Sequence, residues 1–427
     1  MKQSLYKFAA TLLLAAVVLS ACAPAATPAP TAVPPTAMPA ATDTAAPAPT
    51  AMPAATDTAA PTAMAAATNT TAAPTEAATA AATAAATSAG PALKVGLVTD
   101  TGGPDDKSFN ATAIKGMQNA VTDLGLDPSS KYLVSRQQTD YAKNIEEFIS
   151  QGYGMIVTVG FLLGVDTATE AKKNPNVKFT IVDYTYPDCS GTAVEGKDCG
   201  SATAVPNIVG QHYEVQQAAM LAGYLAASVS KSKIVGTFGG VNIPPVVDYM
   251  VGFEAGVKYW DTKHNDTVKL VGWSTSKNDG VFTGTFTDPD KGKAAAQALI
   301  DQGADVVLPV AGLTGNGAFT AAAADKVWAI GVDTDQCVSV PDACPVLLTS
   351  VLKNMDQAVE AVIKSDVDGS FQGGTTYDAT LANNGVGLAP YHNNASMVTP
   401  AVQSEMDQLK ADLIAGKIDV TATAKGS

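Results

Sequence analysis

Three aspartates stand directly after apolar runs of the sequence: Asp100, Asp183 and Asp333. Short apolar runs of this kind are typical of buried parallel strands. In an open α/β sheet, ligands bind beyond the carboxyl ends of the strands. An ionised carboxylate only accepts hydrogen bonds, so three together predict a ligand rich in donors, such as hydroxyl, amine or ring N–H groups. The alternative is that each aspartate caps the turn or helix that follows it.

Two phenylalanines in polar loops suggest that the ligand is flat. Phe109 lies in the acidic loop after Asp100, and Phe286 lies in the segment Thr285-Phe-Thr-Asp-Pro289. Stacking of a base on such a ring contributes about 1–3 kcal/mol to binding. The alternative for Phe286 is ordinary packing, since Phe282 is close to it in the sequence.

A lysine and a glycine follow two further apolar runs. Lys353 ends the run that begins at Leu347 and can donate to a sugar oxygen or a ring nitrogen, although a solvated lysine at a helix start is the alternative. Gly312 follows Val310-Ala311 and allows the backbone to approach a ligand closely. Neither GxGxxG nor GxxxxGK[ST] occurs, so the sequence predicts no phosphate-binding loop.

Strands and helices alternate from Leu93 onward, which predicts parallel sheets covered by helices on both faces. A helix is expected to begin near Ser108, and others to include 144–151 and 292–302. The expected strands are 94–99, 155–159, 178–182, 233–238, 269–273, 305–310, 327–332 and 347–351.

The chain also repeats itself, which predicts two half-domains of one topology. ISQGYGMIVTVG, residues 149–160, aligns with IDQGADVVLPVA, residues 300–311. At nearly the same offset, the strand before Asp183 aligns with the strand before Asp333.

Long motifs resemble those of the basic membrane protein family, the purine-nucleoside-receptor-like lipoproteins of ABC importers. The string TDTGGPDDKSFN, residues 99–110, carries the resemblance most specifically, with a chance acidic turn as its alternative. TFTDPDKGK, residues 285–293, is similar to the family pattern SFxDPxxGK, with Thr285 in place of serine. Further matches are GYGMIVTVGFLLG, FTIVDY, PPVVDYMVGFEAGVKYW, DKGKAAAQALIDQGADVVLPVAG, IGVDTDQ, TSVLK and GVGLAPYH.

The resemblance implies an α/β type I periplasmic-binding-protein fold, with two Rossmann-like lobes around a ligand cleft. It further implies that the two phenylalanines sandwich a purine base, that Asp100 and Asn110 read the edge of the base, and that the remaining polar side chains hold the ribose. The implied pocket consists of Asp100, Phe109, Asn110, Asp183, Phe286, Gly312, Asp333 and Lys353. Leu313 departs from the family, which more often has glycine there.

The first 92 residues are expected to precede the folded domain. Lys2, Lys7 and the apolar run Phe8–Leu19 indicate a signal peptide, and Leu19-Ser-Ala-Cys22 resembles a lipobox in which Cys22 is lipidated. A plain secretory signal is the alternative. Residues 23–92 consist mainly of Ala, Thr and Pro, so a disordered linker with an r.m.s. span of roughly 45 Å is expected.

The fold implied by the family crosses between lobes three times, and we expect the crossings near residues 208, 350 and 372. One lobe then comprises residues 93–208 and about 350–371. The other comprises residues 209–349 and about 372–427.

Charge and cysteine content narrow the class of protein further. The net charge of −14 argues against nucleic acid as a partner, because no basic stripe is present to neutralise phosphates. Apart from Cys22, the cysteines form two close pairs, Cys189 with Cys199 and Cys337 with Cys344. In an exported protein such pairs favour local disulfides over a zinc site, whose usual spacing is absent.

The leading hypothesis is a monomeric, membrane-anchored receptor on the extracytoplasmic face that captures a purine nucleoside for an ABC permease, without a metal or cofactor. A sugar receptor or a sensory module of the same fold is a second hypothesis. A nucleoside hydrolase is a third, and Asp105 and Asp106 are the residues that raise it, but no metal-binding or acid/base constellation accompanies them. Both cysteine loops adjoin expected ligand residues and are expected to influence which nucleoside fits.

Overall fold

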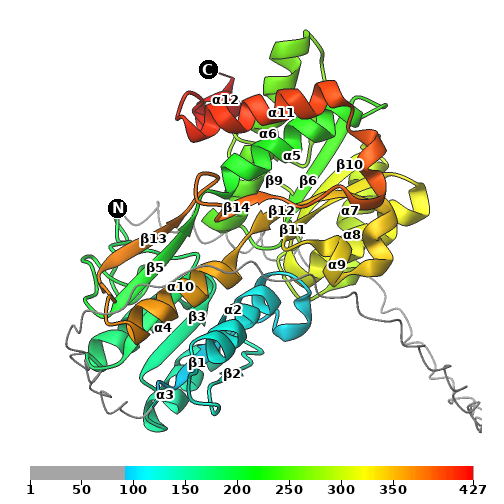
Figure 1. Ribbon diagram of the computed structural model, residues 1–427. Coiled ribbons are helices and arrows are strands. Elements are labelled where there is room, and N and C mark those ends of the chain that lie inside the picture. The colour runs from blue at the N-terminus through cyan, green and yellow to red at the C-terminus, as the bar shows by residue number, and fades with distance from the viewer. Residues whose placement is uncertain (1–91, 427) are drawn as a thin grey trace, which may run out of the picture. The chain divides into compact units, whose positions relative to one another are not determined.

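Most of the strands belong to two six-stranded sheets (Figure 1). This computed structural model describes residues 92–426. The expected signal peptide, Cys22 and all of the expected linker except Ala92 lie outside the described residues. No helix among residues 92–426 is both long enough and apolar enough to cross a membrane.

The first sheet contains the strand that ends at Asp100, and its strands run in the order β2-β1-β3-β4-β5-β13. All of its neighbouring strands are parallel. Its strands are β1 (Val95–Val98), β2 (Lys131–Leu133), β3 (Met155–Val159), β4 (Lys178–Val182), β5 (Ile208–Tyr213) and β13 (Thr375–Ala379).

The second sheet repeats this order as β7-β6-β10-β11-β12-β14. It differs at one edge, because β14 pairs antiparallel with β12 whereas β13 pairs parallel with β5. Its strands are β6 (Ile234–Gly239), β7 (Lys269–Val271), β10 (Val306–Val310), β11 (Trp328–Asp333), β12 (Leu347–Lys353) and β14 (Val386–Leu388). A separate two-stranded sheet consists of β8 (Trp273–Ser274) and β9 (Asp279–Gly280). The shared order confirms the duplicated topology that the sequence repeat predicts.

Helices cover both faces of each sheet, as the alternation predicts. In the first lobe, Ile145 of α3 packs with Ile156 on one face, and Met117 of α2 packs with Val157 on the other. The helices of this lobe are η1 (Pro104–Asp106), α2 (Phe109–Asp123), η2 (Gln138–Asp140), α3 (Tyr141–Ser150), η3 (Phe161–Leu163), α4 (Gly164–Lys173) and α10 (Met355–Val367), which lies beside α2 (Figure 1).

The second lobe has the same layered construction. Leu299 of α7 packs with Phe238 and Val307 on one face, and α5 and α6 lie on the other. Its helices are α5 (Val215–Val229), α6 (Pro244–His264), α7 (Pro289–Ile300), α8 (Gly312–Asp325), α9 (Gln336–Ser339), η4 (Pro341–Val346), η5 (His392–Met397), α11 (Pro400–Ile414) and α12 (Val420–Lys425).

The chain passes between the lobes at three neighbouring places. Glu214 follows β5, Asn354 follows β12, and residues 380–385 join β13 to β14. Backbone hydrogen bonds tie these crossings together, from Glu214 N to Ala379 O and from Asn354 N to Gly385 O, both at 2.9 Å. The crossings expected near 208, 350 and 372 therefore fall several residues too early.

The early placement of the crossings expected near 208 and 372 has a physical cause in the strands beside them. β5 (IVGQHY) carries Gln211 and His212, and β13 (TTYDA) is a polar edge strand, so neither has the continuous apolar run that marks a buried strand. The eight strands expected from apolar runs are all present, although the run 269–273 is divided between β7 and β8.

Candidate ligand-binding site

One cavity between the two lobes contains all eight residues that the sequence singles out. It contains about 590 Å³ of protein-free space, part of which is open to solvent. Its walls include residues of both sheets' carboxyl ends, from η1 and α2 on one side to α6 and α8 on the other. The eight are Asp100, Phe109, Asn110, Asp183, Phe286, Gly312, Asp333 and Lys353.

Asp183 and Asp333 occupy equivalent positions in the two lobes. Asp183 directly follows β4 and Asp333 ends β11, and these strands hold the same place in the two sheets. Both residues have left-handed backbone conformations, with φ of 64° and 69°. Non-glycine residues adopt this conformation uncommonly. The same backbone turn is therefore used twice to bring a carboxylate to the cavity.

Lys353 joins the lobes through Asp183. Its Nζ donates to Asp183 Oδ1 at 2.9 Å and to Oδ2 at 2.8 Å. The side chains are 2% and 6% exposed, which excludes the solvated lysine considered above. The ammonium group also lies 5.3 Å from the ring centre of Phe109 and 5.2 Å from that of Tyr249, both within cation–π range.

Asp333 is held by Tyr249, which donates from its hydroxyl to Asp333 Oδ1 at 2.8 Å. Burial raises the pKa of Asp333 to about 6, against the opposing effects of Lys353 and the Tyr249 hydroxyl. The second carboxylate oxygen has no hydrogen-bond donor among the described residues. Asp333 is therefore an acceptor that faces the cavity with capacity to spare.

The acidic loop after β1 is organised around Asn110. Asn110 Oδ1 accepts from the Asp100 backbone N–H at 2.8 Å, and Asn110 Nδ2 donates to Asp106 Oδ2 at 2.9 Å. Asp106 also accepts from the backbone N–H groups of Asn110 and Ala111 at 2.7 and 3.1 Å, which fixes the start of α2. Asn110 thus has one amide hydrogen left for a ligand, and its oxygen already accepts one hydrogen bond from the backbone.

Asp100 is supported from behind by Tyr141, whose hydroxyl donates to Asp100 Oδ1. The same oxygen accepts from Thr101 N. Burial raises the pKa of Asp100, and the hydrogen bond from Tyr141 opposes that effect. A Cβ on Gly160 would lie 2.8 Å from Asp100 Oδ2, so this glycine leaves the second oxygen room in the cavity.

The two phenylalanines approach the cavity from opposite lobes. Phe109 begins α2, and Phe286 precedes α7. The Phe286 ring lies over Gly240, where a Cβ would come within 2.4 Å of it. Gly312, with φ of 53°, begins α8 beside Phe286. The geometry provides two aromatic rings on opposite sides of one cavity.

Several residues of the cavity were not predicted individually from the sequence. They are Gly102, Asp106, Gly160, Phe161, Ile243, Pro245, Val246, Tyr249, Val310, Ala311, Leu313 and Val332. The motif PPVVDYMVGFEAGVKYW does contain Tyr249, but a tyrosine within a helix carries no sign of its distant partner Asp333. That contact depends on how α6 meets β11.

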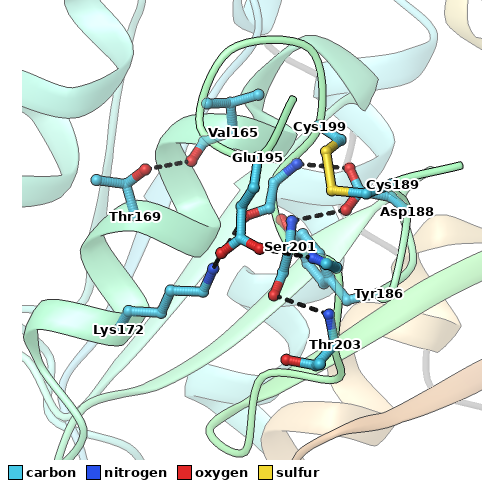
Figure 2. A network of polar contacts seen from close by, with 12 residues as sticks. Val165, Thr169, Lys172, Tyr186, Asp188, Cys189, Glu195, Cys199, Ser201 and Thr203 are labelled. Carbon is cyan, nitrogen blue, oxygen red and sulfur yellow. Dashed lines mark hydrogen bonds and ion pairs between the residues drawn. A yellow bond between two sulfur atoms is a disulfide. The ribbon is translucent and has the colours of Figure 1, made fainter. Parts of the chain in front are cut away.

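Both cysteine pairs form disulfides, Cys189–Cys199 and Cys337–Cys344. The first closes a loop beyond Asp183, where Asp188 accepts from the N–H groups of Gly200 and Ser201 at 2.6 and 2.7 Å (Figure 2). The one group of possible metal ligands found among residues 92–426 is Asp188, Cys189 and Cys199. Its sulfurs belong to the disulfide, so they are not available as thiolate ligands.

The second disulfide loop contacts the opposite lobe. Ser339 Oγ donates to the Lys107 carbonyl oxygen at 2.7 Å. Nearby, Asn316 Nδ2 donates to the Asp106 carbonyl oxygen at 3.3 Å. Together with the Lys353–Asp183 pair, these contacts hold the two lobes against each other.

Comparison with known proteins places this architecture in a family. Residues 93–424 match the family described as ABC transporter substrate-binding protein PnrA-like. An ABC transporter nucleoside-binding protein, BmpA of Lactococcus lactis subsp. cremoris, is 33% identical over 77% of this chain and 89% of its own. An uncharacterized lipoprotein of Pyrococcus horikoshii is 32% identical over 69% of this chain and 68% of its own.

Solved structures agree with this assignment. An ABC transporter solute-binding protein of Aeropyrum pernix K1 superposes with a TM-score of 0.65 at 26% identity, over 77% of this chain and 92% of its own. This similarity and the duplicated sheets confirm the expected type I periplasmic-binding-protein fold. The chain belongs to the PnrA-like family of ABC transporter substrate-binding proteins.

Proposed function

We propose that this protein binds a purine nucleoside between its lobes and delivers it to an ABC permease. The observation that carries the proposal is the composition of the cavity, in which the rings of Phe109 and Phe286, from opposite lobes, accompany four aspartates. The rings suit the flat, apolar faces of a base, and the carboxylates suit the ribose hydroxyls and the N–H groups of the base edge. The similarity to a nucleoside-binding protein supports the same ligand class.

Each polar residue receives a distinct role in this proposal. The Asp100 carboxylate and the remaining amide hydrogen of Asn110 contact the base edge. Asp333 accepts from ribose hydroxyls, and Lys353 and Asp183 exchange part of their mutual contact for contacts with the ribose. Gly312 forms the wall beside Phe286.

The expected affinity follows from these contacts. A micromolar site requires about −8 kcal/mol. Two stacking faces supply about 1–3 kcal/mol each, and charge-assisted hydrogen bonds supply the remainder after the loss of translational and rotational freedom.

Calorimetry on the purified protein, unfolded and refolded to remove carried-over ligand, tests the proposal. Adenosine, guanosine, inosine, cytidine and ribose are titrated in turn. Purine nucleosides should bind at micromolar concentrations or below, and ribose should not bind. Binding of ribose alone would favour a sugar receptor and contradict the stacked base. Chromatography of the same samples checks for free base, whose appearance would show a hydrolase.

Delivery to a permease accords with a membrane-anchored protein on the extracytoplasmic face. We propose that Cys22 carries the lipid, that residues 23–92 tether the domain to the membrane, and that the protein acts as a monomer. Cys22→Ser should move the protein from the membrane fraction to the soluble extracytoplasmic fraction. If the variant stayed with the membrane, the lipid anchor would be wrong.

A further inference from the structure

A second chamber adjoins the ligand cavity beyond Asp183. It contains about 870 Å³ of protein-free space and shares Phe161, Asp183 and Pro245 with the ligand cavity. One wall is the segment that leads into the Cys189–Cys199 loop, with Tyr184, Thr185 and Asp188. The facing wall is the start of α6, with Pro244 and Asp248. Because Asp198 and Pro244 are exposed, the chamber also reaches solvent.

The charge in this chamber is negative. Among residues 92–426, four aspartates line it, Asp183, Asp188, Asp198 and Asp248, and no lysine or arginine does. Of the same residues, His212 is the only basic one in its lining, and His212 Nδ1 already lies 3.3 Å from Asp378 Oδ1 and 4.0 Å from Glu214 Oε1.

The aspartates differ in how many hydrogen-bond donors or ion-pair partners their carboxylates already have. Asp183 is bound to Lys353. Asp188 accepts from Gly200 N and Ser201 N in the disulfide loop (Figure 2), and from the Tyr184 hydroxyl. Asp248 has neither a hydrogen-bond donor nor an ion-pair partner within residues 92–426. Burial raises its pKa to about 6, so at pH 7.5 most of the carboxylate is ionised and available to a ligand.

We infer that this chamber is a subsite for the 5′ end of the ligand, in which Asp248 favours a cationic or hydrogen-bond-donating group and excludes a phosphate. The inference rests on the proposed function, because that function places the ribose at Asp183, the residue that the two cavities share. A group attached to the ribose beyond Asp183 enters the chamber. The expected substrates are therefore nucleosides that are unsubstituted at the 5′ position or carry a neutral or cationic 5′ group. Nucleotides, which carry a 5′-phosphate, are excluded.

The physical basis of the selection is like-charge repulsion in a partly buried space. A 5′-phosphate carries up to two negative charges and only accepts hydrogen bonds at neutral pH, as carboxylates do. It would meet Asp248 and Asp188, while the ammonium group of Lys353 already contacts both oxygens of Asp183. A 5′-ammonium group would instead supply the donors and the positive charge that Asp248 lacks.

Calorimetry at pH 7.5 tests the inference with three probes: adenosine, adenosine 5′-monophosphate and 5′-amino-5′-deoxyadenosine. The measured quantity is the ratio of each affinity to that of adenosine, which cancels general effects on the fold. In the unmodified protein the monophosphate should bind at least about 100-fold more weakly than adenosine, and the amine about tenfold more tightly. Asp248→Asn should raise the monophosphate ratio about tenfold and lower the amine ratio about tenfold.

Asp123→Asn is the matched control. It removes the same charge from an exposed position at the far end of α2 and should leave both ratios unchanged. Thermal unfolding of each variant checks that it folds.

The outcomes separate the chamber from the proposed function. If adenosine binds but the monophosphate binds within about threefold of it, the chamber does not select against phosphate and the inference is wrong. The same holds if Asp248→Asn leaves both ratios as they are. If adenosine itself does not bind to the unmodified protein, the proposed function fails and the role of the chamber fails with it.

Discussion

The ammonium group of Lys353 in one lobe contacts both carboxylate oxygens of Asp183 in the other, at 2.9 and 2.8 Å. Both side chains are almost fully buried. Removal of two charges from water is costly, and their mutual attraction offsets that cost only while the two lobes stay together. The pair therefore links the closed arrangement of the lobes to the chemistry of the ligand cavity.

Replacement of Lys353 should weaken both closure and binding. In Lys353→Met the carboxylate of Asp183 is left without its countercharge, which costs about 3–5 kcal/mol while the lobes are closed. Separation of the lobes relieves this cost by hydrating Asp183. We expect a larger radius of gyration in small-angle X-ray scattering and at least about 100-fold weaker nucleoside binding.

The control for this variant is Lys115→Met. It breaks the exposed ion pair from Lys115 to Asp356, 2.7 Å long and confined to the first lobe. Exposed pairs contribute about 0–1 kcal/mol, so neither measurement should change appreciably. An unchanged radius and affinity in Lys353→Met would show that the buried pair does not couple the lobes to the ligand.

Nucleoside affinity should depend on pH through Asp333. Its pKa of about 6 lies above the ordinary value for aspartate because the group is buried. Ligand hydroxyls require the ionised form as acceptor, so affinity should be constant above about pH 7 and fall as the pH drops through 6, by up to about tenfold per pH unit. Calorimetry between pH 5 and 8 measures this directly.

Protonation of Asp333 has opposite effects on the stability of the fold and on nucleoside affinity. Between the ordinary pKa of aspartate and about 6, the folded protein without ligand binds a proton at Asp333 that the unfolded chain does not. Protonation of Asp333 thus adds stability as the pH falls and removes it as the pH rises through 6.

Two variants test whether the pH dependence of nucleoside affinity arises from Asp333. Asp333→Asn should bind weakly and without this pH dependence. Asp248, which burial also brings to a pKa of about 6, is the comparison, and Asp248→Asn should retain the dependence. A pH profile lost in Asp248→Asn but kept in Asp333→Asn would contradict the assignment.

The two aromatic rings should contribute comparably to nucleoside binding. Phe109→Ala and Phe286→Ala each remove one stacking face, so each should weaken adenosine binding by about 1–3 kcal/mol, roughly 5- to 150-fold. Phe371→Ala is the control, since that ring lies near Lys178 and outside the cavity. If Phe286→Ala bound adenosine normally, the ring would only pack against Gly240.

The Cys189–Cys199 disulfide should stabilise the fold. Its ends are 10 residues apart, and closure of a loop of this length restricts the unfolded chain by roughly 2–3 kcal/mol. Replacement of both cysteines by serine should lower the free energy of unfolding in urea by this amount. The double variant is compared with the unmodified protein under oxidising and reducing conditions, and equal stability of the two when oxidised would contradict the prediction.

The sequence was most informative where chemistry and local pattern coincide. Asp100, Asp183 and Asp333 could be identified because each follows an apolar strand, and parallel strands bring their carboxyl ends to one edge of a sheet. The duplication could be recognised because ISQGYGMIVTVG and IDQGADVVLPVA preserve the same order of helix, turn and strand.

Polar strands and distant partners were less accessible to sequence reasoning. β5 and β13 were missed because an edge strand or a strand with buried polar groups lacks the apolar run by which strands are recognised, so the crossings were placed too early. Tyr249 and Tyr141 carry no local sign that their hydroxyls bind Asp333 and Asp100. Those contacts arise only when a helix packs against a strand end far away in the sequence.

The amino-acid sequence by itself determined the two-lobed α/β architecture, the family and eight of the residues around the cavity, because strand periodicity and motif order are local properties of the chain. Only the tertiary structure decided that Lys353 pairs with Asp183, that the oxygen of Asn110 accepts from the backbone of Asp100, and that Asp248 faces a second chamber without a partner among residues 92–426. Each of these depends on distances between residues of different elements, and such distances are fixed by the packing of the lobes.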